Sequence, residues 1–291
     1  MVTKTTLNGN GGFMSYKIIV DSCCELPAKL KNDDRFQIVS LGLEVGEEFI
    51  WDDESFNQKE FLEKVAACPQ CPKSSCPSPE KFMEAYQCEA DEVYVVTLSS
   101  HLSGSYNSAE LGKSLYIEKY GEKKIHVVDS ESASCGETQL AIRIMRYKEA
   151  GLSFEETVEK IEVFKRKMRT YFVLDNLETL RKNGRLTGVK ALVASTLSIK
   201  PVMVGNLGVI EQKSQAIGIN KALTKMADCI VADVHQTETR TLMITHCNCP
   251  ERAQYMRSLM EKRAAYKNVV IMDTAGVSTM YANDGGIIVT L

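Results

Sequence analysis

The serine-rich segment 98–109 is the part of the chain best equipped to bind a ligand. Its hydroxyls come just before a helical pattern that begins at Ser105. The first N–H groups of a helix lack partners and, together with the helix dipole, favour an anion. A second hydroxyl-bearing segment, 73–79, is stiffened by prolines. The two segments predict a site for a carboxylate or a phosphate, although a helix N-cap and a proline-rich turn would explain the same residues.

Signatures of the common catalytic classes are missing from the sequence. It contains no glycine-rich nucleotide-binding loop and no Gly-x-Ser-x-Gly elbow, and its four histidines lack the spacing of zinc proteases. His126 and His235 fit structural or solvated positions, whereas His101 and His246 could line a crevice. The alternative function is therefore an acyl- or phosphoryl-transfer enzyme, in which His101 or His246 activates a serine of the cluster.

Ten cysteines raise a third hypothesis, a metal or redox protein. Zinc takes about four ligands, and two spacings could contribute to such a site: Cys68-x-x-Cys71 and Cys247-x-Cys249. The second pair has one intervening residue and follows a predicted strand, so we expect no metal site. The polar N-terminal residues do not show a signal-peptide pattern, so we expect reduced thiols.

Composition limits the class of protein. The chain has 291 residues with a formal net charge of −3, and 44% of them are hydrophobic and 25% charged. This length favours about two domains with a large core, and the composition argues against a disordered chain. The charge balance gives no electrostatic footprint for nucleic acid. No apolar stretch reaches the ~18 residues that a membrane span needs, and we expect a cytoplasmic protein.

Short apolar runs alternate with longer helical patterns along the chain, which predicts an α/β fold. The predicted strands are 17–20, 93–97, 125–128, 171–174, 199–204, 241–245 and 269–272. The predicted helices are 59–67, 105–120, 136–150, 153–168, 189–196, 219–234 and 250–264. The first sheet should be mainly parallel. Two short runs around 205–208 predict a hairpin, and hence a mixed second sheet.

Polar residues follow three of these strands directly, as Asp21-Ser22, Ser99-Ser100 and Asp129-Ser130. Since ligands of parallel sheets bind beyond the carboxyl ends of the strands, the three pairs predict one polar rim, although helix capping is the alternative reading of each pair. We divide the chain into residues 1–13, an added leader or upstream false start, an N-terminal α/β domain 14–165 and a C-terminal α/β domain 166–291.

Several segments, in this order, resemble motifs of the DegV family of bacterial fatty-acid-binding proteins. Residues 20–27 are similar to the family's DS-x-x-DLP motif, 74–79 to TSQPSP and 99–106 to SS-x-LSGTY. Farther along, 177–186 resembles LEYLKKGGRI and 199–201 matches IKP. The similarity extends from about residue 17 to 213 and is weaker in the last third. Each motif is modest alone, and their collinear order makes the combination specific.

The resemblance implies two α/β domains that bury a long acyl chain, with its carboxylate at the polar crevice. In the studied branch of the family, the protein presents that carboxylate to a separate ATP-binding fatty-acid kinase subunit. The protein alone would then be non-catalytic, with the fatty acid as ligand and no cofactor. Carried over by position, the ligand-binding residues are Ser74, Ser100, Ser103, Gly104, Arg185 and Tyr281.

Two positions depart from the family pattern. Tyr281 stands where the family's late motif has a histidine, and Lys213 lies in a stretch where the family usually has arginine. A tyrosine with a pKa near ~10 stays neutral and donates a hydrogen bond, but it supplies no cation. Lysine is a point charge rather than a planar fork. Both changes bear on phosphorylation by a kinase more than on lipid binding.

Overall fold

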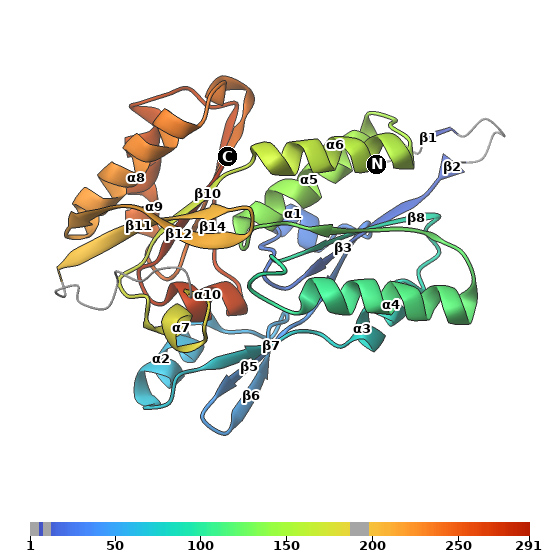
Figure 1. Ribbon diagram of the computed structural model, residues 1–291, viewed down its shortest axis with the longest axis horizontal. Coiled ribbons are helices and arrows are strands. Elements are labelled where there is room, and N and C mark those ends of the chain that lie inside the picture. The colour runs from blue at the N-terminus through green and yellow to red at the C-terminus, as the bar shows by residue number, and fades with distance from the viewer. Residues whose placement is uncertain (1–5, 8–12, 187–197) are drawn as a thin grey trace.

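The computed structural model describes residues 6–7, 13–186 and 198–291. Within them the chain forms two α/β halves that lie side by side (Figure 1). Most of the expected leader 1–13 and the helix expected at 189–196 lie outside the described residues. Near the N-terminus, β1 (Thr6–Leu7) pairs with β2 (Phe13–Met14).

The first half is built on a parallel sheet in the order β4-β3-β8-β9. Its strands are β4 (Phe36–Val39), β3 (Tyr16–Asp21), β8 (Glu92–Thr97) and β9 (Lys124–Asp129). Side chains of successive residues in a strand point to opposite faces of the sheet, so each apolar strand contributes side chains to the hydrophobic cores on both faces. Ile18 and Val20 pack on one face of the sheet, while Ile19 packs on the other. Both faces are therefore covered, as expected for a parallel sheet.

Helices cover both faces of this sheet. Core side chains place α5 (Cys135–Glu149) and α6 (Phe154–Lys167) on one face, and α3 (Pro79–Ala85) and α4 (Ser105–Tyr120) on the other. A capping box between Ser153 and Glu156 starts α6, and Gly121 ends α4 with a left-handed φ of 90°. The short α1 (Ala28–Lys31) follows β3.

A small antiparallel sheet that the sequence did not predict projects from the first half (Figure 1). Its order is β6-β5-β7, with β5 (Gly42–Val45), β6 (Glu48–Trp51) and β7 (Lys73–Ser75). The helix α2 (Gln58–Ala67) lies between β6 and β7 in the chain, with Asn57 as its N-cap. The segment 73–79, expected to be a loop, thus begins as a strand that carries Ser74.

The second half holds a six-stranded mixed sheet in the order β12-β11-β10-β15-β13-β14. Its strands are β10 (Thr170–Val173), β11 (Ile199–Asn206), β12 (Val209–Ile217), β13 (Thr241–His246), β14 (Asn268–Asp273) and β15 (Ile287–Thr290). The predicted hairpin is confirmed: Leu207 and Gly208 both have positive φ and connect β11 to β12. The strand β15 was not predicted, yet it pairs with both β10 and β13.

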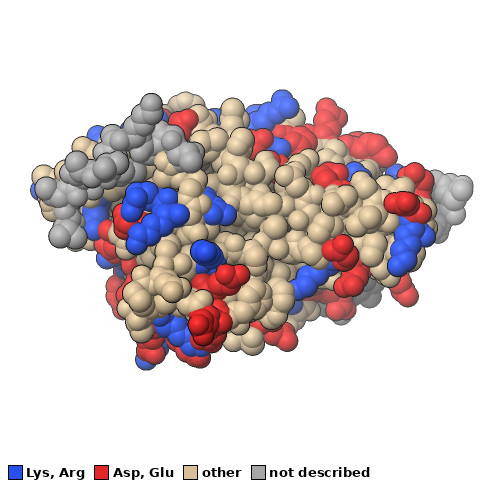
Figure 2. All heavy atoms as spheres, turned by 60° about the horizontal axis from the view of Figure 1, so that its bottom comes forward, with Lys and Arg blue, Asp and Glu red and all other residues tan. Residues whose placement is uncertain are grey.

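Side chains of α8 (Ile219–Asp233) and α9 (Pro250–Glu261) pack on one face of this sheet. The remaining helical elements are α7 (Glu178–Lys182), η2 (Thr237–Thr239) and α10 (Gly276–Ala282). None of the helices in the described part of the chain is both long and apolar enough to span a bilayer. On the face shown in Figure 2, charged side chains of both signs surround a broad uncharged area.

Candidate functional site

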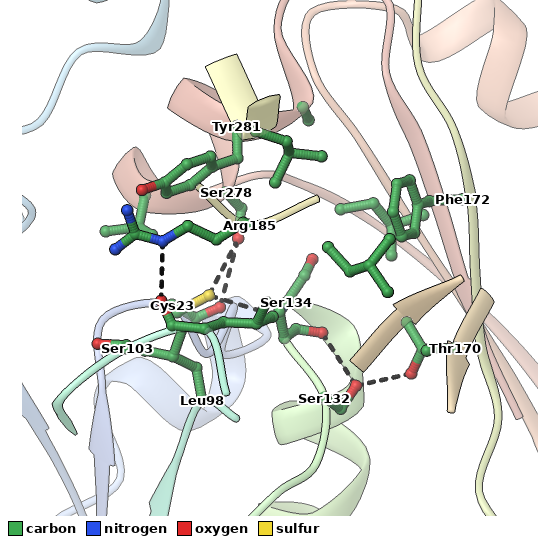
Figure 3. A pocket seen from close by; sticks show the side chains of 18 of the residues that line it. Cys23, Leu98, Ser103, Ser132, Ser134, Thr170, Phe172, Arg185, Ser278 and Tyr281 are labelled. Atoms are coloured by element: carbon green, nitrogen blue, oxygen red, sulfur yellow. Dashed lines mark hydrogen bonds between the residues drawn. The ribbon is translucent and has the colours of Figure 1, made fainter. Parts of the chain in front are cut away.

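A cavity lies between the two sheets, with about 850 Å³ of empty space, part of it open to solvent. Both halves of the chain contribute to its walls, which are largely apolar (Figure 3). The apolar side chains are Leu41, Leu98, Leu102, Phe172, Leu174, Leu180, Ile210, Val277 and Ile288. Such walls suit a hydrocarbon, because burying apolar surface is the main source of affinity there.

One part of the cavity wall gathers four of the expected site residues: Ser74, Ser103, Arg185 and Tyr281. The Ser74 hydroxyl and the Tyr281 hydroxyl are 3.1 Å apart and share a hydrogen bond. The Arg185 guanidinium carbon lies 5.7 Å from the centre of the Tyr281 ring. Burial raises the pKa of Tyr281, so its phenol is a neutral donor at neutral pH. We call this group the polar head of the cavity.

Local structure explains the position of each residue in the polar head. Ser74 lies on β7 directly opposite Leu43 of β5, and Tyr281 is near the end of α10. Ser103 precedes α4, where its hydroxyl accepts a hydrogen bond from the Ser105 backbone N–H at 3.2 Å. Arg185 follows α7 after a left-handed Gly184.

The charge of Arg185 is available to a ligand. Among the described residues, its guanidinium donates to two carbonyl oxygens, those of Leu102 at 3.0 Å and Asn183 at 2.5 Å, rather than to a carboxylate. These bonds fix the side chain beside Tyr281 without neutralising it. The polar head can therefore supply hydroxyl donors and one cation to an anionic group.

Two of the expected residues are not brought to the cavity wall. The Ser100 hydroxyl donates to Asp129 Oδ2 at 2.5 Å, and its backbone N–H donates to Asp129 Oδ1. It therefore links the ends of β8 and β9. Gly104 immediately precedes α4, where an added Cβ would lie 3.0 Å from the Cys76 sulfur. Neither residue is among the described lining residues of the cavity, and both belong to the loop that carries Ser103.

The three strand ends predicted to form a polar rim do lie on adjacent strands, but they serve mainly as internal links. The buried Asp21 carboxylate accepts backbone N–H groups of Leu98 and Cys23, and the Ser22 hydroxyl accepts that of Leu41. The polar groups of these strand ends therefore join neighbouring loops. Residues farther along the same loops, such as Cys23, Ser103 and Ser132, line the cavity.

Four hydroxyl residues on the cavity wall were not identified from the sequence: Ser132, Ser134, Thr170 and Ser278. Ser132 and Ser134 lie three and five residues after the end of β9. The polar rim predicted at Asp129-Ser130 therefore pointed to this loop, although not to these two serines. Thr170 and Ser278 come from the second half of the chain. No local pattern marks them, because only the packing of the two halves brings them to the cavity.

A group of four buried carboxyl residues lies around this region: Asp21, Glu25, Asp52 and Glu137. Burial raises the pKa of Asp21 and of Asp52 to about 6 and that of Glu25 to about 7, and it holds the pKa of Glu137 well above its usual range. Both carboxyl oxygens of Glu137 lack a hydrogen-bond partner among the described residues. A charged Glu137 would be costly there, so burial favours its protonated form.

The histidines and the paired cysteines behind the alternative functions are not among the described lining residues of the cavity. The described lining residues of the cavity include no histidine, and His246 Nδ1 accepts the backbone N–H of Cys249. All ten cysteines are free thiols, and the described residues contain no group of three or more side chains arranged to hold a metal ion. Lys213 forms an ion pair with Asp233 at 2.7 Å, away from the cavity wall.

The fold and the cavity define a class of protein: an α/β protein with a largely apolar cavity between its two halves and a polar head on the cavity wall. The profile of a family described as "uncharacterised protein, DegV family" matches residues 15–290. A DegV domain-containing protein of Streptococcus gordonii is 33% identical over 280 residues, which cover 94% of this chain and 98% of that one. The chain belongs to the DegV family.

Solved structures agree in fold over nearly the whole chain. The structure of a DegV-family protein of Ruminococcus gnavus has a TM-score of 0.94 and 53% identity to this chain, covering 96% of this chain and 100% of that one. That structure is reported with vaccenic acid. The Fatty Acid Kinase (Fak) B3 protein of Streptococcus pneumoniae, loaded with linoleic acid, has a TM-score of 0.84 and 30% identity, covering 95% and 99%.

Proposed function

We propose that this protein binds one long-chain fatty acid in the cavity, with the carboxyl group at the polar head. The observation that carries the proposal is the cavity itself, whose walls are largely apolar and whose polar head brings hydroxyls and one arginine together. The fatty acids named for the Ruminococcus gnavus and Streptococcus pneumoniae relatives support the same ligand class.

The apolar walls supply most of the binding energy. Each buried methylene is worth ~0.8 kcal/mol, so a chain of about fourteen gives ~11 kcal/mol before costs. Loss of translational and conformational freedom removes several kcal/mol, which leaves a micromolar or tighter complex. The polar head then orients the ligand: Ser74, Ser103 and Tyr281 donate hydrogen bonds, and Arg185 balances the charge of a carboxylate.

The protein acts as a carrier that presents its ligand rather than as an enzyme. The Streptococcus pneumoniae relative is named as a Fatty Acid Kinase (Fak) B3 protein. This name supports a separate ATP-binding kinase subunit as the partner of this chain. Tyr281 cannot supply the cation of the family histidine, so Arg185 is the group left to stabilise negative charge during phosphorylation.

We place this function in the cytoplasm and assign it to two domains, 14–165 and 166–291, that close over the ligand.

The test is native mass spectrometry of the protein as isolated from bacterial cells. The expected result is an added mass equal to one C14–C18 fatty acid, which organic extraction removes and added oleic acid restores. A protein that carries no added mass and shows no change on titration with C14–C18 acids would rule the proposal out.

A further inference from the structure

A second polar group lies on the cavity wall away from the polar head. The Ser132 and Thr170 hydroxyl oxygens are 2.6 Å apart and both residues are buried. Figure 3 shows this pair on the opposite side of the cavity from Arg185 and Tyr281, below Phe172. The polar head accounts for one end of a fatty acid, so the Ser132–Thr170 pair has no role in the proposed function.

The Ser132–Thr170 pair has hydrogen-bonding capacity to spare. Each hydroxyl has one donor hydrogen and two acceptor lone pairs. Among the described residues, the further hydrogen bond of these hydroxyls is a long one, 3.4 Å from the Ser132 hydroxyl to the carbonyl oxygen of Ala133. Room for the pair depends on Gly136, because an added Cβ there would lie 1.9 Å from the Ser132 hydroxyl oxygen. The pair can therefore bind one more oxygen.

A smaller hollow, with about 290 Å³ of empty space that includes open solvent, lies beside the pair. The two spaces share Glu131, Thr170 and Gly205 as lining residues. The smaller hollow is also lined by three cationic residues: Lys165, Arg166 and Arg169. This end of the cavity is thus bounded by polar groups, where a hydrocarbon terminus gains little from burial and a polar terminus keeps hydrogen-bond partners.

A neutral polar group suits this place better than a second carboxylate. Glu131 lies on the shared wall, and it is 3.4 Å from Lys165. Lys165 also pairs with Glu162 at 2.8 Å. The charge of Lys165 is therefore already balanced, and an added carboxylate would face Glu131. A hydroxyl both donates and accepts, which matches the Ser132–Thr170 pair.

From these contacts we propose that the cavity accepts long-chain hydroxy acids, with the chain hydroxyl bound by Ser132 and Thr170. The proposal rests on the proposed function and narrows its ligand class. The test measures the affinity of the full chain, stripped of lipid, for palmitic acid, 12-hydroxyhexadecanoic acid, 16-hydroxyhexadecanoic acid and hexadecanedioic acid. Two hydroxyl positions are used because the depth of the bound chain sets which position reaches the pair.

The decisive variant is Thr170→Val, which keeps the size and β-branching of a strand residue and removes the hydroxyl. It should weaken binding of at least one hydroxy acid about tenfold relative to palmitic acid, since a buried hydroxyl loses its partner. The matched control is Thr290→Val, on the paired strand directly opposite Thr170, whose hydroxyl contacts Cys135 and is not among the lining residues. It should leave the ratio unchanged.

The outcomes separate the two proposals. If palmitic acid does not bind the wild-type protein, the proposed function fails. If palmitic acid binds but Thr170→Val changes the affinity ratio by less than about threefold for both hydroxy acids, the hydroxy-acid proposal is wrong and fatty-acid binding stands. Tighter binding of hexadecanedioic acid than of both hydroxy acids would also overturn it, in favour of an anion at the cationic hollow.

Discussion

The Asp52 carboxylate accepts hydrogen bonds from two successive backbone N–H groups, those of Gly276 at 2.7 Å and Val277 at 2.8 Å. Glu25 accepts the preceding N–H, that of Ala275, at 3.2 Å. Two acids from the first half of the chain thus hold the N-terminus of α10, which comes from the second half. Because α10 carries Val277, Ser278 and Tyr281 of the cavity wall, this contact joins the two halves at the site.

Asp52→Ala should therefore lower both stability and ligand affinity. It leaves two backbone N–H groups without an acceptor in a buried place, which costs about 1–3 kcal/mol. Urea unfolding measures the stability, and titration with a fluorescent fatty acid measures the affinity. The control is Glu54→Ala, an exposed acid two residues away, which should change neither. Wild-type stability in Asp52→Ala would contradict the role of this contact.

The buried carboxyl residues should make the protein less stable as the pH rises from about 4.5 to 7. The pKa of Asp21 is raised to about 6 and that of Glu25 to about 7, so the folded state binds more protons than the unfolded state in this range. By linkage, stability is full below the unfolded pKa values and is lost as the pH passes the folded ones. Urea unfolding at several pH values measures the slope.

Glu137→Gln tests the origin of that slope. Its carboxyl oxygens have no hydrogen-bond partner among the described residues, and burial holds its pKa well above the usual range. The neutral amide should reduce the loss of stability between pH 6 and 8, whereas the exposed control Glu122→Gln should keep the wild-type slope. An identical slope in both variants would mean that Glu137 does not contribute.

The sequence predicted the parts of the fold that local patterns encode. The start of α4 at Ser105 and the buried runs of β3, β8 and β9 agree with the structure to within a residue or two. The small sheet was missed because its strands are short and one of them, β6, is mostly exposed. Ser74 and Ser103 were predicted from family motifs and do line the cavity. Ser278 and Thr170 were not, because their role depends on contacts between the halves.

Replacing both serines of the polar head should weaken fatty-acid binding without unfolding the protein. Ser74→Ala with Ser103→Ala removes two hydroxyls from residues of the cavity wall, and the expected loss is about tenfold. The variant removes the hydroxyls that hydrogen-bond Tyr281 and Ser105, so urea unfolding should show a small loss of stability in a protein that still folds. Ser114→Ala, whose hydroxyl donates to the Glu110 carbonyl outside the cavity, is the control. Unchanged affinity in the double variant would refute this placement of the carboxyl group.

Tyr281→Phe isolates the single hydroxyl that stands in place of the family histidine. The phenol is 3.1 Å from Ser74, and burial raises its pKa, so it acts as a donor and not as a charge. Its loss should weaken binding of palmitic acid about three- to tenfold and leave the pH dependence of binding unchanged between pH 6 and 8. Tyr266→Phe is the matched control, because the Tyr266 hydroxyl is buried without a partner among the described residues. If the two variants bind palmitic acid equally well, the Tyr281 hydroxyl does not contact the ligand, and Arg185 with the two serines would have to hold the carboxylate alone.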